Sequence, residues 1–277
     1  MSAPLRFDLS GFNVTIRGVD AACAETIREA WGLFEGAGGV ALIGIDVRFE
    51  APDLSSGPID DAPLERTISG AAIEFRSSEG SIAIDEKGRG VAIVSTGNAT
   101  KRAFALINLI VPALAWRLPA HDASILHSGA VLVDDRGFLL LGQAGAGKST
   151  FVTHAIAAGA RAVSEDLNLV VFEGGRCRLA GSPLRTRVHR GPGPGRWPLA
   201  AILVPDHGNP VALEPVPRLL ASAQLQANLP FVGDCWMQVP GGPALTRRLD
   251  EVPVRRLRFV PDSSFVALLE QWPGEDP

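Results

Sequence analysis

The stretch Gly142-Gln143-Ala144-Gly145-Ala146-Gly147-Lys148-Ser149 has the pattern G-x-x-x-x-G-K-[ST] of a phosphate-binding loop, the Walker A motif. The apolar run at residues 137–141 directly before it is typical of a buried strand. Residues 150–158 after it contain neither Gly nor Pro and carry apolar side chains at helical spacing. The motif therefore has the strand, loop and helix context that it requires.

The residue types of this loop suit a polyphosphate. Glycines allow the tight turns that aim successive N–H groups at one anion, and the following helix begins with unpaired N–H groups. Lys148 adds a charge near the outer phosphates, and the Ser149 hydroxyl can ligate Mg²⁺. The alternative is a chance glycine-rich turn. The predicted nucleotide-binding residues are Gly142, Gln143, Ala144, Gly145, Ala146, Gly147, Lys148, Ser149 and Thr150.

Composition indicates a packed globular protein. The 277 residues are 46% hydrophobic and 20% charged, and the net charge of −4 argues against a general nucleic-acid binder. Three cysteines lie far apart without a CxxC pair, which argues against a disulfide framework or a zinc site and favours free thiols in a reducing compartment. We therefore expect a cytoplasmic protein that contacts no nucleic acid.

Neither a secretory signal nor a membrane anchor is expected. Residues 1–20 lack a long apolar core. The most apolar segment, residues 103–116, is shorter than the ~20 residues that a membrane-spanning helix needs, so it predicts a buried core helix.

Two domains are expected, with a boundary near residue 118. Residues 1–118 predict an α+β unit that serves as a docking or accessory domain. Residues 119–277 predict an α/β domain that carries the phosphate-binding loop. The expected elements of the first unit are strands at 5–9, 12–16, 41–49, 71–75, 81–84 and 91–95 and helices at 20–33 and 96–116. Those of the second are strands at 125–133, 137–141, 160–164, 167–172, 199–204 and 254–259 and helices at 150–158, 216–228 and 263–272. The turn at residues 134–137 predicts that its two flanking strands pair antiparallel.

The adjacent acids Glu165 and Asp166 are candidate catalytic and metal-binding residues. They follow the strand after the post-loop helix, which brings them back beside the phosphate-binding loop. One carboxylate can ligate Mg²⁺ together with Ser149, and the other can accept a proton from an attacking hydroxyl. The alternative is a solvated surface turn.

His127 and two arginines complete the predicted site. His127 lies in the strand expected beside the loop-bearing strand, where contact with the acidic pair is one interpretation and a structural histidine is the other. Arg185 and Arg187 lie in a segment rich in Pro, Gly and Arg. They can neutralise charge in a phosphoryl-transfer transition state, although arginine runs are usually solvated.

Three blocks in this order resemble the HPr kinase/phosphorylase family, including its relatives from lasso-peptide clusters. They are His127-Ser128-Gly129-Ala130, the glycine-rich motif at 142–149, and Gly159 followed by Val163-Ser164-Glu165-Asp166. The resemblance covers about residues 125–172, and the first acid is Glu165 where the family has Asp. It implies a phosphate-binding-loop α/β fold akin to phosphoenolpyruvate carboxykinase, and transfer of the ATP γ-phosphate to a serine hydroxyl. By position, Glu165 corresponds to the base, Asp166 to its Mg²⁺-side partner, and His127 to the histidine that tunes the base.

The leading hypothesis is an ATP- and Mg²⁺-dependent kinase that phosphorylates Ser or Thr of a peptide or protein. Lys148 would hold the γ-phosphate, and Ser149, Glu165 and Asp166 would hold the metal. Two alternatives stay open: a kinase of small-molecule alcohols and a nucleotide-sensing module without transfer activity. Assembly into a homo-oligomer is compatible with each of them.

Overall fold

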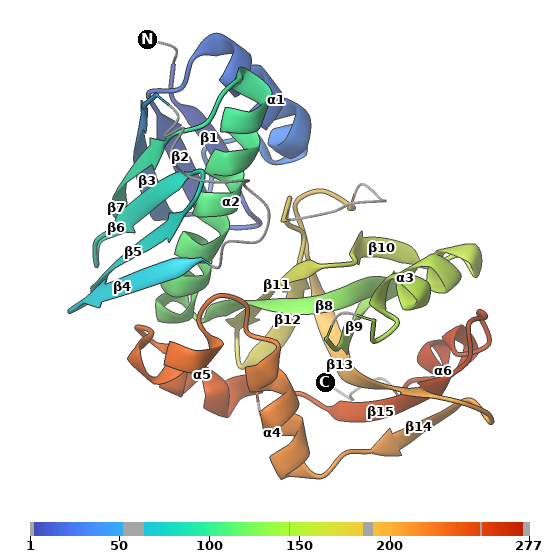
Figure 1. Cartoon of the computed structure of the whole chain (residues 1–277). Coiled ribbons are helices and arrows are strands. Elements are labelled where there is room, and N and C mark those ends of the chain that lie inside the picture. The colour runs from blue at the N-terminus through green and yellow to red at the C-terminus, as the bar shows by residue number, and fades with distance from the viewer. Residues whose placement is uncertain (1–2, 52–63, 144, 185–190, 250, 274–277) are drawn as a thin grey trace. The chain divides into compact units, whose positions relative to one another are not determined.

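The computed structural model describes residues 3–51, 64–143, 145–184, 191–249 and 251–273. The chain divides into two compact units, Met1–Leu118 and Pro119–Pro277, and Figure 1 shows the elements of each. The predicted site residues Ala144, Arg185 and Arg187 lie outside the described residues.

The first unit is built on one sheet, which has seven strands within the described residues. The order is β1-β2-β3-β7-β6-β5-β4, with β2, β3 and β7 parallel and the remaining neighbours antiparallel. Its strands are β1 (Leu5–Asp8), β2 (Phe12–Arg17), β3 (Val40–Phe49), β4 (Glu65–Ser69), β5 (Ala72–Ser77), β6 (Gly80–Ile84) and β7 (Arg89–Val94). The strand β4 was not predicted, because this edge strand has no buried residue and no apolar alternation marks it.

Two helices cover this sheet, and both begin at a side-chain cap. Asp20 accepts the N–H of Cys23 at the start of α1 (Ala21–Trp31), and Asn98 accepts the N–H of Lys101 at the start of α2 (Ala99–Arg117). The 3₁₀ turn η1 (Gly32–Phe34) follows α1. Helix α2 contacts β3, β5, β6 and β7, so its long apolar sequence packs on the sheet (Figure 1).

The segment Ala99–His121 is long and apolar enough to cross a membrane by length and composition. It comprises α2 and the 3₁₀ turn η2 (Leu118–His121). In its most apolar window 83% of the residues are buried inside the protein. This burial agrees with the predicted core helix.

The second unit is built on a mixed sheet of eight strands, counted within the described residues. The order is β10-β8-β11-β12-β13-β15-β14, and β9 pairs with both β8 and β13. The strands are β8 (Ala123–Val133), β9 (Arg136–Leu141), β10 (Arg161–Ser164), β11 (Leu167–Glu173), β12 (Arg176–Ala180), β13 (Arg196–His207), β14 (Ala212–Pro215) and β15 (Val254–Phe259). The antiparallel pairing of β8 with β9 confirms the predicted hairpin. Strands β9 and β15 run parallel to β13.

The helices of this unit are α3 (Lys148–Ala157), α4 (Arg218–Ala227), α5 (Gly242–Leu249) and α6 (Val266–Glu270), with the 3₁₀ segment η3 (Gly233–Gln238) before α5. The terminal helix is shorter than the predicted 263–272. A core of buried apolar residues joins α3 and α6 to the sheet. Within it, Phe265 stacks on Phe151 with ring centroids 5.0 Å apart and meets Phe259 edge to face at 5.5 Å. These aromatic contacts fix the position of α3, whose first residue is Lys148.

Candidate functional site

The glycine-rich motif lies between β9, which ends at Leu141, and α3, which begins at Lys148. Gly147 is the N-cap of α3 with φ 90°, in the left-handed region that favours glycine. The N–H of Phe151 donates to the Gly147 carbonyl at 2.8 Å and closes the first turn. The N–H groups of the preceding residues are those that a helix start leaves without an intrahelical acceptor, and they suit an anion.

Gly129 lets α3 lie directly on β8. A Cβ atom at this position would come within 3.0 Å of the Lys148 carbonyl oxygen and 3.2 Å of a Val152 methyl group. Contacts this short are tighter than ordinary van der Waals contact, so a side chain here would require α3 to shift by a few tenths of an ångström. Gly129, which follows His127 and Ser128 in the motif, therefore allows the start of α3 to approach β8 closely.

Lys148 is buried and bonded to its own loop. Its Nζ donates to the carbonyl of Gly142 at 2.6 Å and to that of Gln143 at 3.0 Å. Burial lowers the pKa of the Lys148 ammonium, and the carboxylate of Asp166 acts in the opposite direction. Asp166 is therefore an electrostatic neighbour of the loop lysine.

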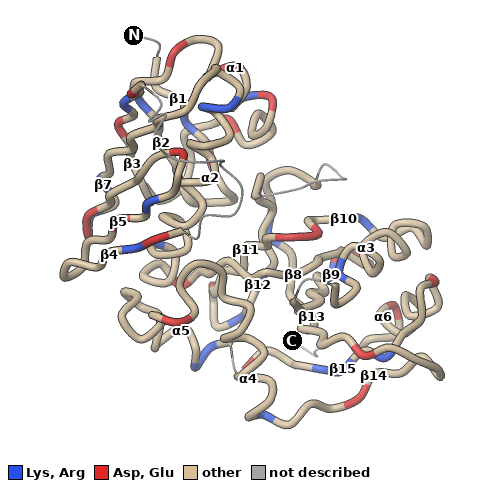
Figure 2. Tube along the Cα trace, in the orientation of Figure 1, with Lys and Arg blue, Asp and Glu red and all other residues tan. Residues whose placement is uncertain are grey.

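The acidic pair forms the link between β10 and β11, which both pair with β8 (Figure 2 shows the acidic segment between them). The N–H of Ser128 on β8 donates to the Asp166 carbonyl at 2.9 Å, and on its other side Ser128 is the partner of Leu141. One residue of β8 is thus flanked by the acidic link and by the last residue before the glycine loop. This register brings the acidic link toward the glycine loop although Asp166 lies 18 positions after Lys148 in the sequence.

His127 and Asp166 are in contact, with 3.1 Å between His127 Nε2 and Asp166 Oδ1. Their side chains are 35% and 20% exposed, so both can be reached from solvent. Glu165 differs, because only 6% of the residue is exposed. The two carboxylates therefore occupy different environments: that of Asp166 is partly exposed beside an imidazole, and Glu165 is buried.

Hydrogen bonds of the buried residues Asn168 and Ser164 hold the acidic link in place. Its Nδ2 donates to the Ser128 carbonyl at 2.6 Å and reaches the Ser128 hydroxyl at 3.1 Å. The N–H of Asp166 donates to the Ser164 hydroxyl at 3.2 Å. Asn168 and Ser128 are fully buried, so these bonds fix the turn that carries both acids.

Asn228, at the end of α4, joins the histidine strand to the glycine loop. Its carbonyl accepts the N–H of His127 at 2.9 Å, and its Oδ1 accepts the N–H of Gly142 at 3.2 Å. Its Nδ2 donates to the Gln224 carbonyl at 2.8 Å, and the residue is 2% exposed. Sequence reasoning missed it, because an Asn at a predicted helix end reads as a cap, and only the fold brings it to the loop.

The end of β13 forms another wall of the loop and was also missed. A Cβ atom on Gly147 would lie 3.4 Å from the His207 ring, and one on Gly142 would lie 3.4 Å from Pro205. His207 is exposed and packs against Phe259, with ring centroids 5.8 Å apart. It is a candidate contact for whatever the loop binds.

The residues present fit a magnesium ion better than an all-protein metal cage. Within the described residues no group of three or more His, Cys, Asp or Glu side chains could hold a metal. Mg²⁺ usually takes one or two carboxylates and completes its shell with phosphate oxygens and water. Asp166 lies in the field of Lys148, and Ser149 is exposed in the first turn of α3. That donor set suits Mg²⁺ on a bound polyphosphate.

Comparisons with known proteins find similarity at the level of structure. No protein-family model matches the chain, and no curated protein matches it. Among solved structures, the chain is similar to the HPr(Ser) kinase/phosphatase from Coxiella burnetii at 15% sequence identity and a TM-score of 0.30. The match covers 54% of this chain and 93% of that one. With the TM-score below 0.5, the functional assignment rests on the residues described above.

Proposed function

We propose that this protein is an ATP- and Mg²⁺-dependent kinase that transfers the γ-phosphoryl group to a hydroxyl, with Ser or Thr of a peptide or protein as the acceptor. One observation carries the proposal: through Ser128 of β8, the sheet register places Asp166, which contacts His127, across that strand from Leu141, the last residue before the glycine loop. A lysine at a helix N-terminus with a carboxylate beside it is what a polyphosphate and its metal require.

The glycine loop supplies the phosphate site. The first N–H groups of α3 bind phosphate oxygens, and the Lys148 ammonium leaves the carbonyls of Gly142 and Gln143 to pair with the outer phosphates. Ser149 and Asp166 are the residues that would hold Mg²⁺, with Glu165 next to them in the acidic pair. When bound, this ion neutralises charge on the phosphates.

The acidic pair serves the acceptor. Glu165 orients the acceptor hydroxyl and takes its proton while the hydroxyl oxygen forms a bond to the γ-phosphorus. The bond between the γ-phosphorus and the bridging oxygen breaks, and ADP leaves with the electron pair. His127 holds the Asp166 carboxylate in position through the 3.1 Å contact, so it is a positioning residue. Arg185 and Arg187 are proposed to neutralise charge in the transition state.

The proposal also includes a reducing, cytoplasmic setting, since the three cysteines are free thiols.

The second candidates for the function are a small-molecule alcohol kinase and a nucleotide-sensing module. Glu165, in place of the family's Asp, motivates the sensing module, because its extra methylene shifts the carboxylate by about an ångström.

An assay of phosphoryl transfer from γ-labelled ATP distinguishes the kinase of peptides or proteins, the alcohol kinase and the sensing module. The wild-type protein is incubated with Mg²⁺, labelled ATP and two acceptor sets, Ser/Thr peptides and small alcohols. We expect label on a peptide hydroxyl. We expect Glu165→Gln to abolish transfer with nearly unchanged nucleotide affinity, and Asp166→Asn to weaken the Mg²⁺ dependence. Glu270→Gln, at an exposed acid of α6, is the matched control. Label only on alcohols favours the second reading. Saturable ATP binding with no transfer to any acceptor favours the sensing module.

A further inference from the structure

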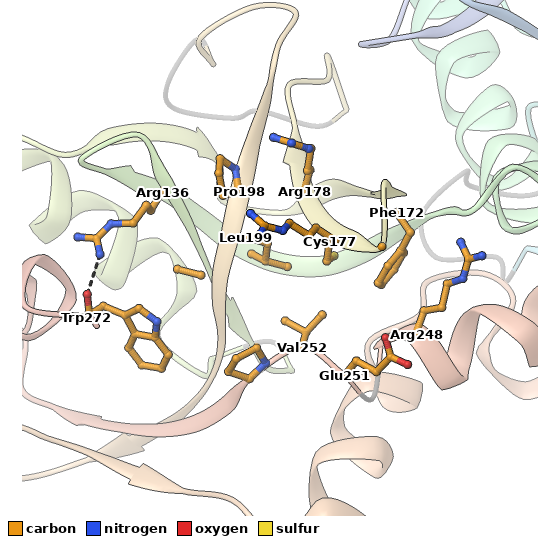
Figure 3. A pocket seen from close by; sticks show the side chains of 14 residues that line it. Arg136, Phe172, Cys177, Arg178, Pro198, Leu199, Arg248, Glu251, Val252 and Trp272 are labelled. Atoms are coloured by element: carbon orange, nitrogen blue, oxygen red, sulfur yellow. Dashed lines mark hydrogen bonds between the residues drawn. The ribbon is translucent and has the colours of Figure 1, made fainter. Parts of the chain in front are cut away.

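A cavity of about 290 Å³ lies in the second unit, apart from the glycine loop. Figure 3 shows Arg136 and Trp272 toward one side of it and Arg248 with Glu251 toward the other. Arg136 is the first residue of β9 and Leu141 the last. At about 3.3 Å per strand residue, the length of β9 puts roughly 17 Å between the cavity and the loop. It is therefore a separate site.

The walls of this cavity are largely apolar. Phe172 from β11, Leu199 from β13 and Val252 before β15 each have 7–8% of their surface exposed. The indole of Trp272 adds an aromatic surface, packed edge to face on Phe138 at 6.1 Å. Such a lining suits an aromatic or branched aliphatic group, and the volume is close to the lower end for small-molecule sites.

Most of the lining charges already have partners. Arg178 is paired with Glu173 at 2.6 Å, and one Nη of Arg248 is paired with Asp122 at 2.8 Å. The guanidinium of Arg136 donates to the carbonyls of Trp272 and Glu270. These arginines shape the rim, and Arg248 keeps further donors on an exposed guanidinium.

Arg176 and Glu251 differ from the other charged lining residues. Both are exposed, and within the described part of the chain neither side chain makes an ion pair. An uncommitted guanidinium presents a fork of N–H donors that matches a carboxylate. The Glu251 carboxylate, which lines the same cavity, opposes a second negative charge in the ligand. One such guanidinium together with one such carboxylate favours a singly charged anion over a phosphate.

We propose that this cavity binds a small monocarboxylate with an aromatic or branched aliphatic body. The carboxylate pairs with Arg176, assisted by the remaining donors of Arg248. The apolar body lies on Phe172, Leu199 and Val252. The shared chemistry covers plain carboxylic acids and apolar amino acids. In an amino acid the ammonium group would face Glu251.

Isothermal titration calorimetry of the full-length protein with 3-phenylpropionate, 3-phenylpropionamide and L-phenylalanine tests the site. We expect saturable binding of 3-phenylpropionate and at least tenfold weaker binding of the uncharged amide, because the amide loses the charge-assisted pair. If L-phenylalanine binds more tightly than 3-phenylpropionate, and Glu251→Gln removes this difference, the site is assigned to amino acids. If 3-phenylpropionate binds more tightly than L-phenylalanine, the site is assigned to carboxylic acids without an ammonium group.

Variants locate the binding. Arg176→Gln combined with Arg248→Gln is expected to weaken 3-phenylpropionate about tenfold or more. Arg247→Gln is the matched control, since Arg247 is exposed, neighbours Arg248 and does not line the cavity. Lys148→Ala should bind the probe like the wild type, whether or not the protein is a kinase. Absence of saturable binding, equal affinity for the amide, or an unaffected double variant would overturn the proposal.

Discussion

The Oδ1 atom of Asn228 accepts the N–H of Gly142, the first residue of the glycine loop, at 3.2 Å. The same residue accepts the N–H of His127 through its carbonyl. One buried residue at the end of α4 thus ties the loop, through its side chain, to the strand that carries the histidine, through its main-chain carbonyl. This side chain therefore helps to set the geometry of the loop.

Replacing Asn228 with Ala is expected to weaken nucleotide binding about tenfold, since the buried Gly142 N–H loses its acceptor and the loop loses its tie. Asn228→Asp keeps an oxygen there and should retain more affinity than Asn228→Ala. Fluorescence titration with a labelled ATP analogue measures both, and thermal unfolding checks the fold. Wild-type affinity in a folded Asn228→Ala protein would refute this role.

The effect of the Asp166 charge on the pKa of Lys148 can be measured directly. The chain has three lysines, Lys87, Lys101 and Lys148, so lysine labelled with ¹³C at Cε gives three resolvable signals. Burial lowers the pKa of Lys148 and Asp166 opposes that shift, so Asp166→Asn should lower this pKa further. The Lys87 and Lys101 signals serve as internal controls. An unchanged Lys148 titration in Asp166→Asn would show that the two groups do not interact.

The aromatic cluster under α3 is expected to hold the second unit together. Phe265→Ala removes the stack on Phe151 and the edge contact with Phe259, and should cost about 3–5 kcal/mol of unfolding free energy. Phe265→Leu keeps most of the volume and should cost less. Urea denaturation of the three proteins measures the difference. A loss below about 1 kcal/mol in Phe265→Ala would contradict the packing.

Cys23 is expected to resist alkylation in the native protein. Burial, and secondarily the Asp20 charge, raises the pKa of this thiol from 9.0 to about 11, and the residue is 0% exposed. Iodoacetamide at pH 8 followed by mass spectrometry should find Cys23 unmodified until the protein is unfolded. Rapid native labelling would contradict its burial.

The same thiol makes stability depend on pH. Its pKa is higher in the folded state, so its contribution is fully present below pH 9 and is lost as the pH rises toward 11. Cys23→Ser tests this, because a serine hydroxyl does not titrate in that range. The wild type should lose more unfolding free energy than Cys23→Ser between pH 9 and pH 11.

Sequence patterns predicted the elements that carry strong local signals. The strand before the glycine loop, the helix after it and the hairpin of β8 with β9 all have turn or spacing signals of their own. Strands β12 and β14 were missed, since β12 mixes arginines with apolar residues and β14 is four residues with none buried. Helix α5 was also missed, because it has only eight residues and begins with the pair Gly242-Pro243, which is typical of a turn.

The residues of the candidate site also divide into those with a local sequence signal and those without one. Lys148 and the acidic pair were named from local motifs, and their roles stay predictions. The sequence could not reveal that Asn228 and His207 border the loop, because sheet order brings them there across gaps of some 60 residues or more. The cavity of Arg176 and Glu251 was equally out of reach, since its lining comes from five separate parts of the chain.

The most direct test of the central claim is calorimetric titration of ATP with Mg²⁺ into the wild-type protein and Lys148→Ala. The account predicts saturable, Mg²⁺-dependent binding to the wild type and roughly 10²-fold weaker binding to the variant, since Lys148 supplies the principal charge at the phosphates. Lys101→Ala, at an exposed lysine of α2, should bind like the wild type. Absence of binding, or equal affinity in Lys148→Ala, would contradict the account.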